Sequence, residues 1–130
     1  MIRLNCSSPT LDPLELNTLH TMWQESLEDI LNCTTLAGCG HPGGSMSSIH
    51  FLLVLYALAN VRLDNYKSPD RDRIIVSHGH ISPGVYAALA QFKFFPREEM
   101  VLNFRKFGPG LRFKRMIVFQ CLHVSIKLPA

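Results

Sequence analysis

A long amphipathic helix is predicted near the start of the chain. The apolar positions recur at steps of four, four, three and one residues, which is helical spacing with one buried face. They are Leu19, Trp23, Leu27, Ile30 and Leu31. The helix is predicted over about residues 18–37, with Asn17 as its cap and Gly38 at its end. Residues 1–17, which contain two prolines, are predicted to be irregular.

A second helix is predicted from about Met46 to Val61, with Ser45 as its cap. Its stretch 51–59 is apolar on all sides. That stretch is only about half of the ~20 residues that a bilayer requires, so a buried helix is predicted rather than a membrane span. The β-branched run 73–77 then predicts a short buried strand.

The strand leads into a third predicted helix, with Ser82 as its cap and Pro83 as its first residue. A fourth helix is predicted over about residues 96–106, with two glutamates placed well against its dipole. The Gly-Pro-Gly sequence at residues 108–110 ends this helical pattern. Residues 111–130 predict one or two strands.

Composition and charge fit one soluble globular unit: the chain has 130 residues, of which 47% are hydrophobic and 18% charged. The net charge of +3 is uneven, since residues 1–92 hold five basic and eight acidic residues, whereas residues 93–130 hold eight basic and two acidic ones. A basic end can indicate nucleic-acid binding, but no nucleic-acid-binding module accompanies it. The four cysteines show no paired framework and no secretory signal opens the chain, which predicts a reducing, cytoplasmic compartment.

Two Gly-His turns carry the candidate chemistry. They are residues 38–44 (Gly-Cys-Gly-His-Pro-Gly-Gly) and residues 77–84 (Ser-His-Gly-His-Ile-Ser-Pro-Gly), each ahead of a predicted helix. Glycine allows a ligand to approach the backbone closely, histidine transfers protons near neutral pH, and a helix start favours anions. The second turn also follows a strand, at the end where open α/β sheets bind ligands. We therefore expect the two turns to form two edges of one site.

These segments resemble transketolases. Residues 40–48 (Gly-His-Pro-Gly-Gly-Ser-Met-Ser-Ser) resemble the Gly-His-Pro-Gly motif of that family, and residues 72–80 (Asp-Arg-Ile-Ile-Val-Ser-His-Gly-His) resemble its Arg-Asp-Arg, strand and Ser-x-Gly-His segment. Residues 103–108 resemble the Phe-Arg helix that follows. One piece, residues 79–87, is more similar to the homodimeric pyruvate dehydrogenase component of the same thiamine diphosphate superfamily. The resemblance covers about residues 18–108, and its motifs occur in the family's order and spacing.

The resemblance implies an α/β fold, namely the N-terminal part of a doubly wound thiamine-diphosphate-binding domain that is incomplete here. The implied function is transfer of a two-carbon ketol unit between sugar phosphates. His41 would face the reacting carbon of the cofactor and the donor sugar, as a catalytic acid/base and substrate ligand. His80, Gly79 and Gly40 would bind the cofactor. His78 stands where relatives usually have Asn or Lys, so no role is assigned to it.

Several parts of the family pattern are not found in this sequence. A third histidine in a Pro-Gly-His turn is missing, as is the Gly-Asp-Gly segment that holds Mg²⁺ and thereby the diphosphate. The resemblance therefore implies a second subunit or a missing C-terminal portion, homo-oligomers in the full-length family, and inactivity of the isolated chain. A frameshift or a truncated gene model would also produce a divergent, basic segment such as residues 109–130.

Other interpretations remain open. The runner-up enzyme is a decarboxylating 2-oxo acid dehydrogenase component, and the non-enzymatic interpretation is a remnant or assembly fragment. His41 could simply cap a helix. A metal site could form from Cys39, His41, His78 and His80, but their spacing differs from that of common zinc modules, so no metal ligand is assigned. Neither a nucleic acid nor a membrane is expected as a partner.

Overall fold

The computed structural model describes residues 3–4, 10–106, 118–120 and 123–125. Four α-helices, a short 3-10 helix and three short strands are present in this part of the chain. In order they are α1 (Pro13–Ala37), α2 (Pro42–Leu58), β1 (Ile75–Val76), η1 (Gly79–Ile81), α3 (Ser82–Gln91), α4 (Arg97–Asn103), β2 (Val118–Gln120) and β3 (His123–Ser125).

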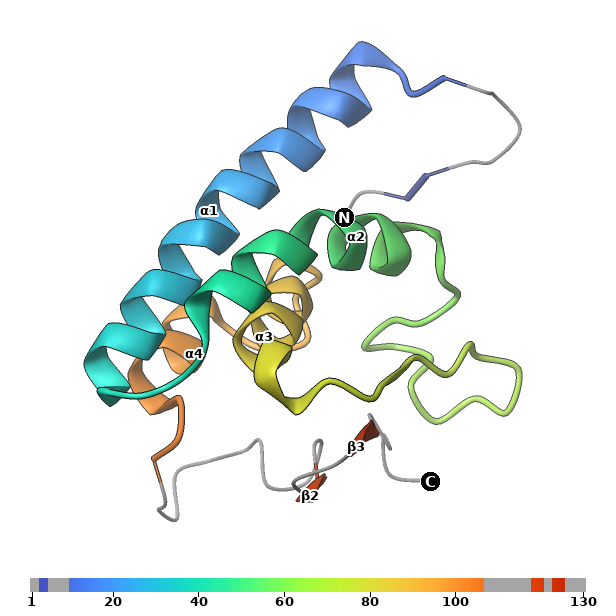
Figure 1. Ribbon diagram of the computed structural model, residues 1–130. Coiled ribbons are helices and arrows are strands. Elements are labelled where there is room, and N and C mark those ends of the chain that lie inside the picture. Colours follow the sequence, from blue (N-terminus) through green and yellow to red (C-terminus); the bar gives the residue numbers. More distant parts are fainter. Residues whose placement is uncertain (1–2, 5–9, 107–117, 121–122, 126–130) are drawn as a thin grey trace.

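Helix α3 is the centre of the fold, with α1, α2 and α4 packed around it (Figure 1). Every residue of α3 except Tyr86 is buried. The small side chains along α3 allow its neighbours to approach closely, and larger side chains from α1, α2 and α4 fill the space between them. The largest fully buried apolar side chains are Ile30, Ile49, Leu52, Leu53, Leu89 and Met100. These residues form one core where the four helices meet.

Helix α1 begins at Pro13, five residues before the predicted start at residue 18. The Asp12 carboxylate accepts a hydrogen bond from the Leu14 amide, and the Glu15 carboxylate accepts one from the Asp12 amide, which together form a capping box. The prediction failed because proline was interpreted as a breaker, although its fixed φ suits the first position of a helix. The predicted end is confirmed: Gly38 adopts φ 61°, a left-handed conformation that glycine favours.

The predicted caps of α2 and α3 are wrong. Helix α2 begins at Pro42, so Ser45 lies inside its first turn and is completely buried instead of capping. Ser82 is likewise buried as the first residue of α3, after η1. A Cβ atom at Gly84 would lie 3.0 Å from the backbone oxygen of Ser45. The backbones of α2 and α3 therefore approach one another as closely as a glycine permits.

The α/β class that the resemblance implies is not confirmed by the described residues, which are mostly helical. Strand β1 is where a strand was predicted, but it has only two residues, and Ile75 is 68% exposed rather than buried. The three described strands pair antiparallel in the order β1-β3-β2, unlike a doubly wound parallel sheet. A β-branched run is fully buried only where layers cover both of its faces; Ile74 and Val76 pack against the helical core, whereas Ile75 stays open. The two strands expected within residues 111–130 are β2 and β3; the rest of that segment lies outside the described residues.

Helix α4 is tied to α1 by a cluster of charged side chains. Arg97 donates to the Asp29 carboxylate through Nε (2.8 Å) and Nη2 (3.1 Å) and forms an ion pair with Glu25 (2.8 Å). Gln91 at the end of α3 also donates to Glu25. The hydrogen bond from Arg97 to Asp29 is the main cause that raises the pKa of Arg97. A bidentate, part-buried pair of this kind fixes the position of α4 more firmly than an exposed pair would.

Among the residues that the structure describes, no helix is both long and apolar enough to cross a membrane. The prediction that residues 51–59 form a helix buried on all sides is only half right. Leu52, Leu53, Tyr56 and Ala57 are buried in the core, whereas the other face of the helix exposes Phe51, Val54 and Leu58.

The approach of α2 to α3 leads to a stability prediction. Gly84→Ala places a methyl group 3.0 Å from the Ser45 oxygen, so we expect the free energy of unfolding to fall by about 1–3 kcal/mol. Gly43→Ala is the matched control, because a Cβ there meets no atom within 4 Å and alanine favours a helix; it should raise stability by up to about 1 kcal/mol. Chemical denaturation of both variants measures the difference. Equal effects would show that the helices can separate freely.

Candidate cofactor-binding site

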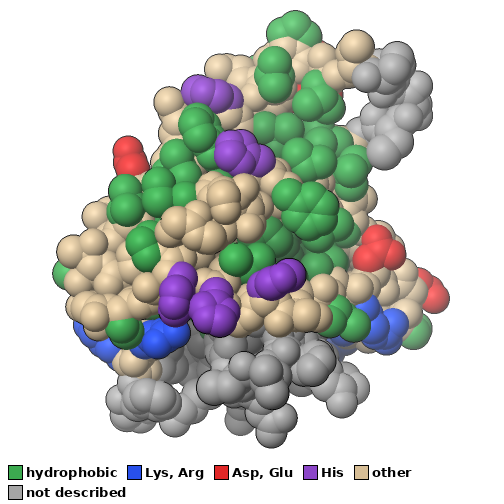
Figure 2. Space-filling model, viewed as in Figure 1, with side chains coloured by type: hydrophobic (Ala, Val, Ile, Leu, Met, Phe, Trp, Pro, Cys, Tyr) green, Lys and Arg blue, Asp and Glu red, His purple; other side chains and the backbone are tan. Residues whose placement is uncertain are grey.

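The two Gly-His turns lie side by side. The imidazole rings of His41 and His80, which are 39 residues apart in sequence, have their centroids 4.5 Å apart with an angle of 76° between the ring planes. Both side chains are exposed. Histidine side chains gather along the lower edge of the face seen in Figure 2. The two turns therefore lie next to each other, as the prediction of two edges of one site requires.

Helix geometry places both rings. His41 is the residue before α2, with φ −125° and ψ 80°, and its side chain makes no capping hydrogen bond. His41 is therefore the N-cap residue of α2 by position, as that interpretation had it, but its ring nitrogens do not cap the helix. His80 lies in η1, immediately before α3. Because α2 and α3 both start at these turns, the positive ends of two helix dipoles lie next to the histidine pair, which favours an anionic ligand there.

Gly40 and Gly79, both expected to bind the cofactor, differ in their structural roles. Gly40 has φ 129°, and a Cβ there would come within 2.8 Å of Thr34 Cγ2. The fold itself requires glycine at this position. At Gly79 a Cβ would meet nothing within 4 Å and φ is not positive, so the fold does not require glycine. The space beside Gly79 is open to a ligand.

The residues that support the first turn were not predicted from the sequence. Thr34 at the end of α1 and Phe104 after α4 both pack against the position of Gly40, at 2.8 and 3.5 Å from where a Cβ would stand. Arg105 lies 3.9 Å from the exposed Cys39 thiol. The resemblance of residues 103–108 to the family's Phe-Arg helix was the available signal, but it gave no indication of which turn this helix would support.

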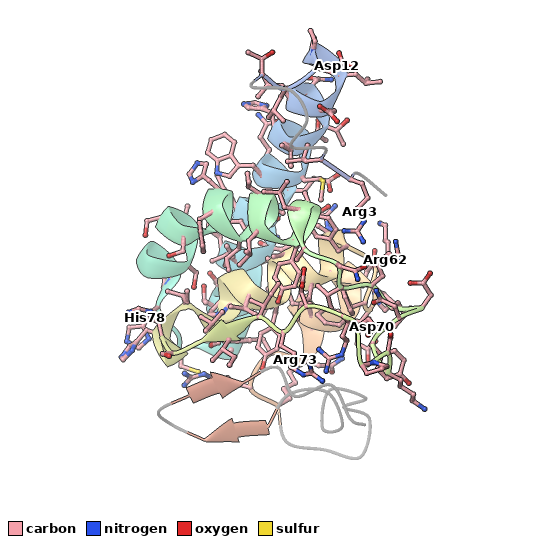
Figure 3. All side chains as sticks on the ribbon, turned by 90° about the vertical axis from the view of Figure 1, so that its right-hand side faces the viewer. Arg3, Asp12, Arg62, Asp70, Arg73 and His78 are labelled. Carbon is pink, nitrogen blue, oxygen red and sulfur yellow. The ribbon has the colours of Figure 1, made fainter. Side chains whose placement is uncertain are left out.

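Three other histidines, His20, His50 and His78, are not part of the His41–His80 pair. His78 is exposed, at the edge of the molecule beside the start of α2, whereas Arg62 and Asp70 lie at the opposite end of that helix (Figure 3). His20 and His50 contact the ring of Trp23, at centroid distances of 5.3 and 5.1 Å. The four-residue metal site considered for Cys39, His41, His78 and His80 is not formed: no group of three or more His, Cys, Asp or Glu residues in the described chain could hold a metal ion.

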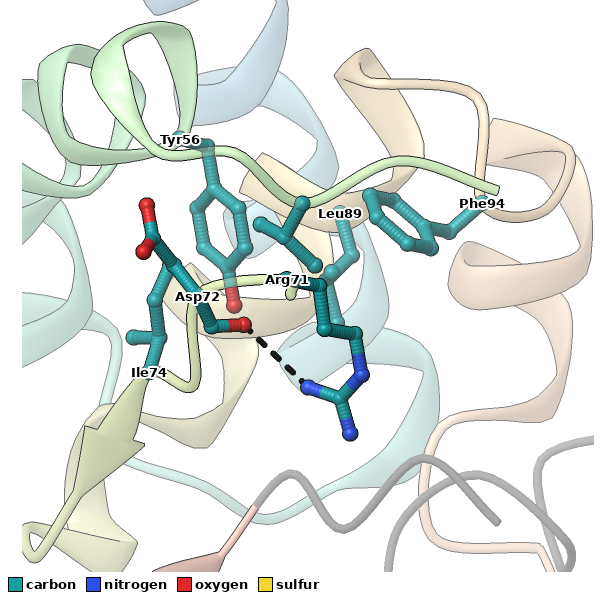
Figure 4. Close-up of a pocket in the computed structure, with 7 residues that line it drawn as sticks. Tyr56, Arg71, Asp72, Ile74, Leu89 and Phe94 are labelled. Atoms are coloured by element: carbon teal, nitrogen blue, oxygen red, sulfur yellow. Dashed lines mark hydrogen bonds between the residues drawn. The ribbon is translucent and has the colours of Figure 1, made fainter. Parts of the chain in front are cut away.

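A small cavity lies away from the histidine pair, between Tyr56, Leu89, Phe94 and residues 71–74 (Figure 4). Its volume of about 10 Å³ is room for one water molecule and not for a cofactor. The Tyr56 hydroxyl has no hydrogen-bond partner among the described residues, and burial raises the pKa of Tyr56 well above its ordinary value. Arg71 at the mouth of the cavity donates to the backbone oxygen of Asp72. This cavity is therefore too small for a large ligand, whereas the space beside Gly79 is open.

Comparison with known proteins decides the family. Residues 29–110 match the family described as the transketolase, thiamine diphosphate binding domain. That match includes both Gly-His turns and α2, α3 and α4. The chain belongs to the transketolase family.

Individual transketolases agree with this assignment. The chain is 45% identical over 62 residues to the 6-deoxy-6-sulfo-D-fructose transketolase subunit SqwG of Clostridium sp. (strain MSTE9), which covers 47% of this chain and 22% of that protein. It is 36% identical over 83 residues to the transketolase of Mus musculus, covering 62% of this chain and 13% of that protein. It is 29% identical over 86 residues to an apulose-4-phosphate transketolase subunit of Phocaeicola vulgatus, covering 65% of this chain and 31% of that protein.

The chain thus spans less than a third of the length of each of these transketolases. The relatives include full-length transketolases as well as proteins named as subunits. No solved structure matches the chain.

The two described cysteines near this site should differ in reactivity. Cys39 is exposed, whereas burial, aided by the charge of Asp29, raises the pKa of the Cys33 thiol to about 12. Because the thiolate is the reactive form, the buried Cys33 should react far more slowly than Cys39. We expect iodoacetamide to alkylate Cys39 in the native protein and Cys33 only in denaturant, as measured by peptide mass spectrometry. Similar native rates at both thiols would contradict the burial of Cys33 in the helical core.

Proposed function

We propose that this chain contributes the His41 and His80 turns to a transketolase-type active site that uses thiamine diphosphate to transfer a two-carbon ketol unit between sugar phosphates. The observation that carries the proposal is the 4.5 Å separation of the two rings. The packing of α3 on α2 brings the two motifs together, and both imidazoles stay exposed, where one ligand can contact both. The family match over residues 29–110, which contains both motifs, supports the same conclusion.

Thiamine diphosphate, when bound, supplies a carbanion that cleaves a carbon–carbon bond next to a carbonyl. In this proposal the chain positions the reactants and handles protons. A ring nitrogen of His41 accepts or returns the proton of a donor-sugar hydroxyl and binds that hydroxyl between steps. A ring N–H of His80 donates to the diphosphate side, where the dipoles of α2 and α3 also favour negative charge.

The residues near the pair fit an anionic cofactor but not its metal. Gly79 leaves open space next to His80, and the close packing of Thr34 on Gly40 fixes the backbone directly before His41. Mg²⁺ prefers several oxygen ligands, and the described residues contain no group of three or more His, Cys, Asp or Glu side chains that could hold it. We therefore assign the Mg²⁺ ligands to residues outside this described region, and the isolated chain is proposed to be inactive.

The proposal includes a larger assembly. In this view the described helices are the first part of an α/β domain, and the remainder comes from a second subunit or a C-terminal portion, in a homo-oligomer. The relatives named as subunits are consistent with division of the family's function between chains. A cytoplasmic location is also proposed, since Cys33 and Cys39 are free thiols.

A decarboxylating 2-oxo acid dehydrogenase component remains the alternative enzyme, favoured only by residues 79–87. The two functions differ in their products: transfer of a ketol unit conserves carbon, whereas decarboxylation releases CO₂. A non-catalytic remnant or assembly fragment is the other alternative. It is favoured for the chain alone because the described side chains include no group of three or more His, Cys, Asp or Glu that could hold Mg²⁺.

Cofactor binding by the isolated chain is the first test. We expect calorimetric titration of thiamine diphosphate with Mg²⁺ to detect weak binding or none, because the diphosphate lacks its metal ligands. Tight binding that depends on Mg²⁺ would contradict the proposed incompleteness of the site. Circular dichroism of the titrated sample serves as the folding control: its helical content must match that of the structure, so that absence of binding cannot be due to an unfolded chain.

The roles of the histidines are tested in a complete enzyme. In a chimera, residues 29–106 of this chain replace the matching part of mouse transketolase, with which the chain is 36% identical over 83 residues. We expect transketolase activity, and a loss of roughly 10²–10⁴-fold in kcat for His41→Ala. His80→Ala should mainly weaken cofactor binding. His50→Ala, whose ring contacts Trp23, is the matched control and should leave both unchanged.

Two outcomes would overturn parts of this proposal. If the folded chimera binds thiamine diphosphate but neither histidine variant changes kcat or cofactor affinity, the site residues are wrong. If the chimera releases CO₂ from pyruvate faster than it transfers a ketol unit, the 2-oxo acid alternative is correct.

A further inference from the structure

The histidine pair also meets the requirements of a metal chelate. Both rings are exposed, and none of the described residues forms a hydrogen bond with their nitrogens. His41 is not used in capping α2. Four ring nitrogens are therefore available within a small space, on two turns that are fixed by the helices following them.

The spacing of the rings suits a shared ion. Zn²⁺ binds imidazole nitrogen at about 2.0–2.1 Å with tetrahedral geometry, so two imidazoles on one ion have their centroids about 5 Å apart. The His41 and His80 centroids are 4.5 Å apart and their planes are inclined by 76°. Rotation about the side-chain torsions of two exposed rings is enough to direct one nitrogen of each toward a common point.

The supporting backbone holds the two rings in register. Gly84 on α3 packs directly on Ser45 of α2, where a Cβ would stand 3.0 Å from the Ser45 oxygen. Gly44 on α2 packs on Ile81 of η1, where a Cβ would stand 3.6 Å from Cγ2. Because these contacts flank both histidines, the backbone of the two turns is already in place, and an ion would have to order only the two side chains.

The ligand set selects the class of ion. Imidazole suits Zn²⁺, Ni²⁺ and Cu²⁺, whereas Mg²⁺ requires oxygen ligands. No third His, Cys, Asp or Glu completes a group with the pair in the described residues, so water would fill the remaining positions. The site is therefore an open one of moderate affinity and not a closed structural zinc site.

We propose that His41 and His80 together chelate one borderline divalent transition-metal ion of the Zn²⁺ or Ni²⁺ class. Metal binding needs only the two rings and is independent of the proposed function. A second consequence does rest on that function: an ion on the pair occupies the nitrogens that would handle protons, so the metal inhibits the transketolase site and is removed by a chelator.

Titration of Zn²⁺ alone into the full chain tests the chelate. We expect one ion per chain by calorimetry, with affinity lowered at least roughly tenfold in both His41→Ala and His80→Ala, because either change leaves a single ligand. His50→Ala and His78→Ala are the matched controls and should bind as the parent chain does. Any weaker binding by the cysteines is common to all these variants.

Two results would overturn the chelate. One is a Zn²⁺ affinity of His41→Ala or His80→Ala equal to that of the parent chain. The other is loss of Zn²⁺ binding in Cys39→Ser with no loss in the two histidine variants. His41→Gln and His80→Gln repeat the test with side chains of similar size, and thermal unfolding without metal must be unchanged in each. In the chimera, inhibition by Zn²⁺ tests the second consequence. If Zn²⁺ binds through the pair but the active chimera is not inhibited, the chelate stands and the catalytic role of the pair fails.

Discussion

The arrangement depends on the contact between the backbones of α2 and α3. Gly84 has no side chain, and a Cβ there would stand 3.0 Å from the Ser45 oxygen. Because α2 starts directly after His41 and α3 starts directly after η1, which contains His80, the distance between these helices determines the distance between the two rings. A larger side chain at Gly84 would push α3 away from α2 and so move the two histidine turns apart.

The same contact explains why the serine cap was predicted wrongly. Serine before an apolar run normally caps a helix, and this rule considers only the local sequence. Ser45 instead lies one turn inside α2, where its small size permits the approach of α3. Its hydroxyl has no partner among the described residues, and an unpaired buried hydroxyl costs about 1–3 kcal/mol. Tertiary packing has therefore overridden a local capping preference at the point where the two turns meet.

Prediction from the sequence was most successful where the local backbone conformation suits only one kind of residue. Gly38 ends α1 because its φ of 61° is unfavourable for other residues, and this could be predicted from its place after an apolar periodic run. The convergence of the two Gly-His turns could be expected from the family's motifs. Thr34 and Phe104 could not be identified, because both pack against Gly40 although one lies on the preceding helix and the other follows α4. No pattern in the sequence links such positions.

Burial of the strand was predicted wrongly for a related reason. Residues 73–77 have the composition of an inner strand, yet composition describes what a segment can bury and not what is available to cover it. Ile75 is 68% exposed, and Phe51 on α2 is 67% exposed. Fully burying such a side chain contributes about 1.5–3 kcal/mol, and here this contribution is not realised. Apolar side chains left open on a strand and on a helix are what the first part of a larger α/β domain would show before its remaining layers are added. Their exposure therefore supports the same proposal as the missing metal ligands, on physical grounds that do not involve the histidines.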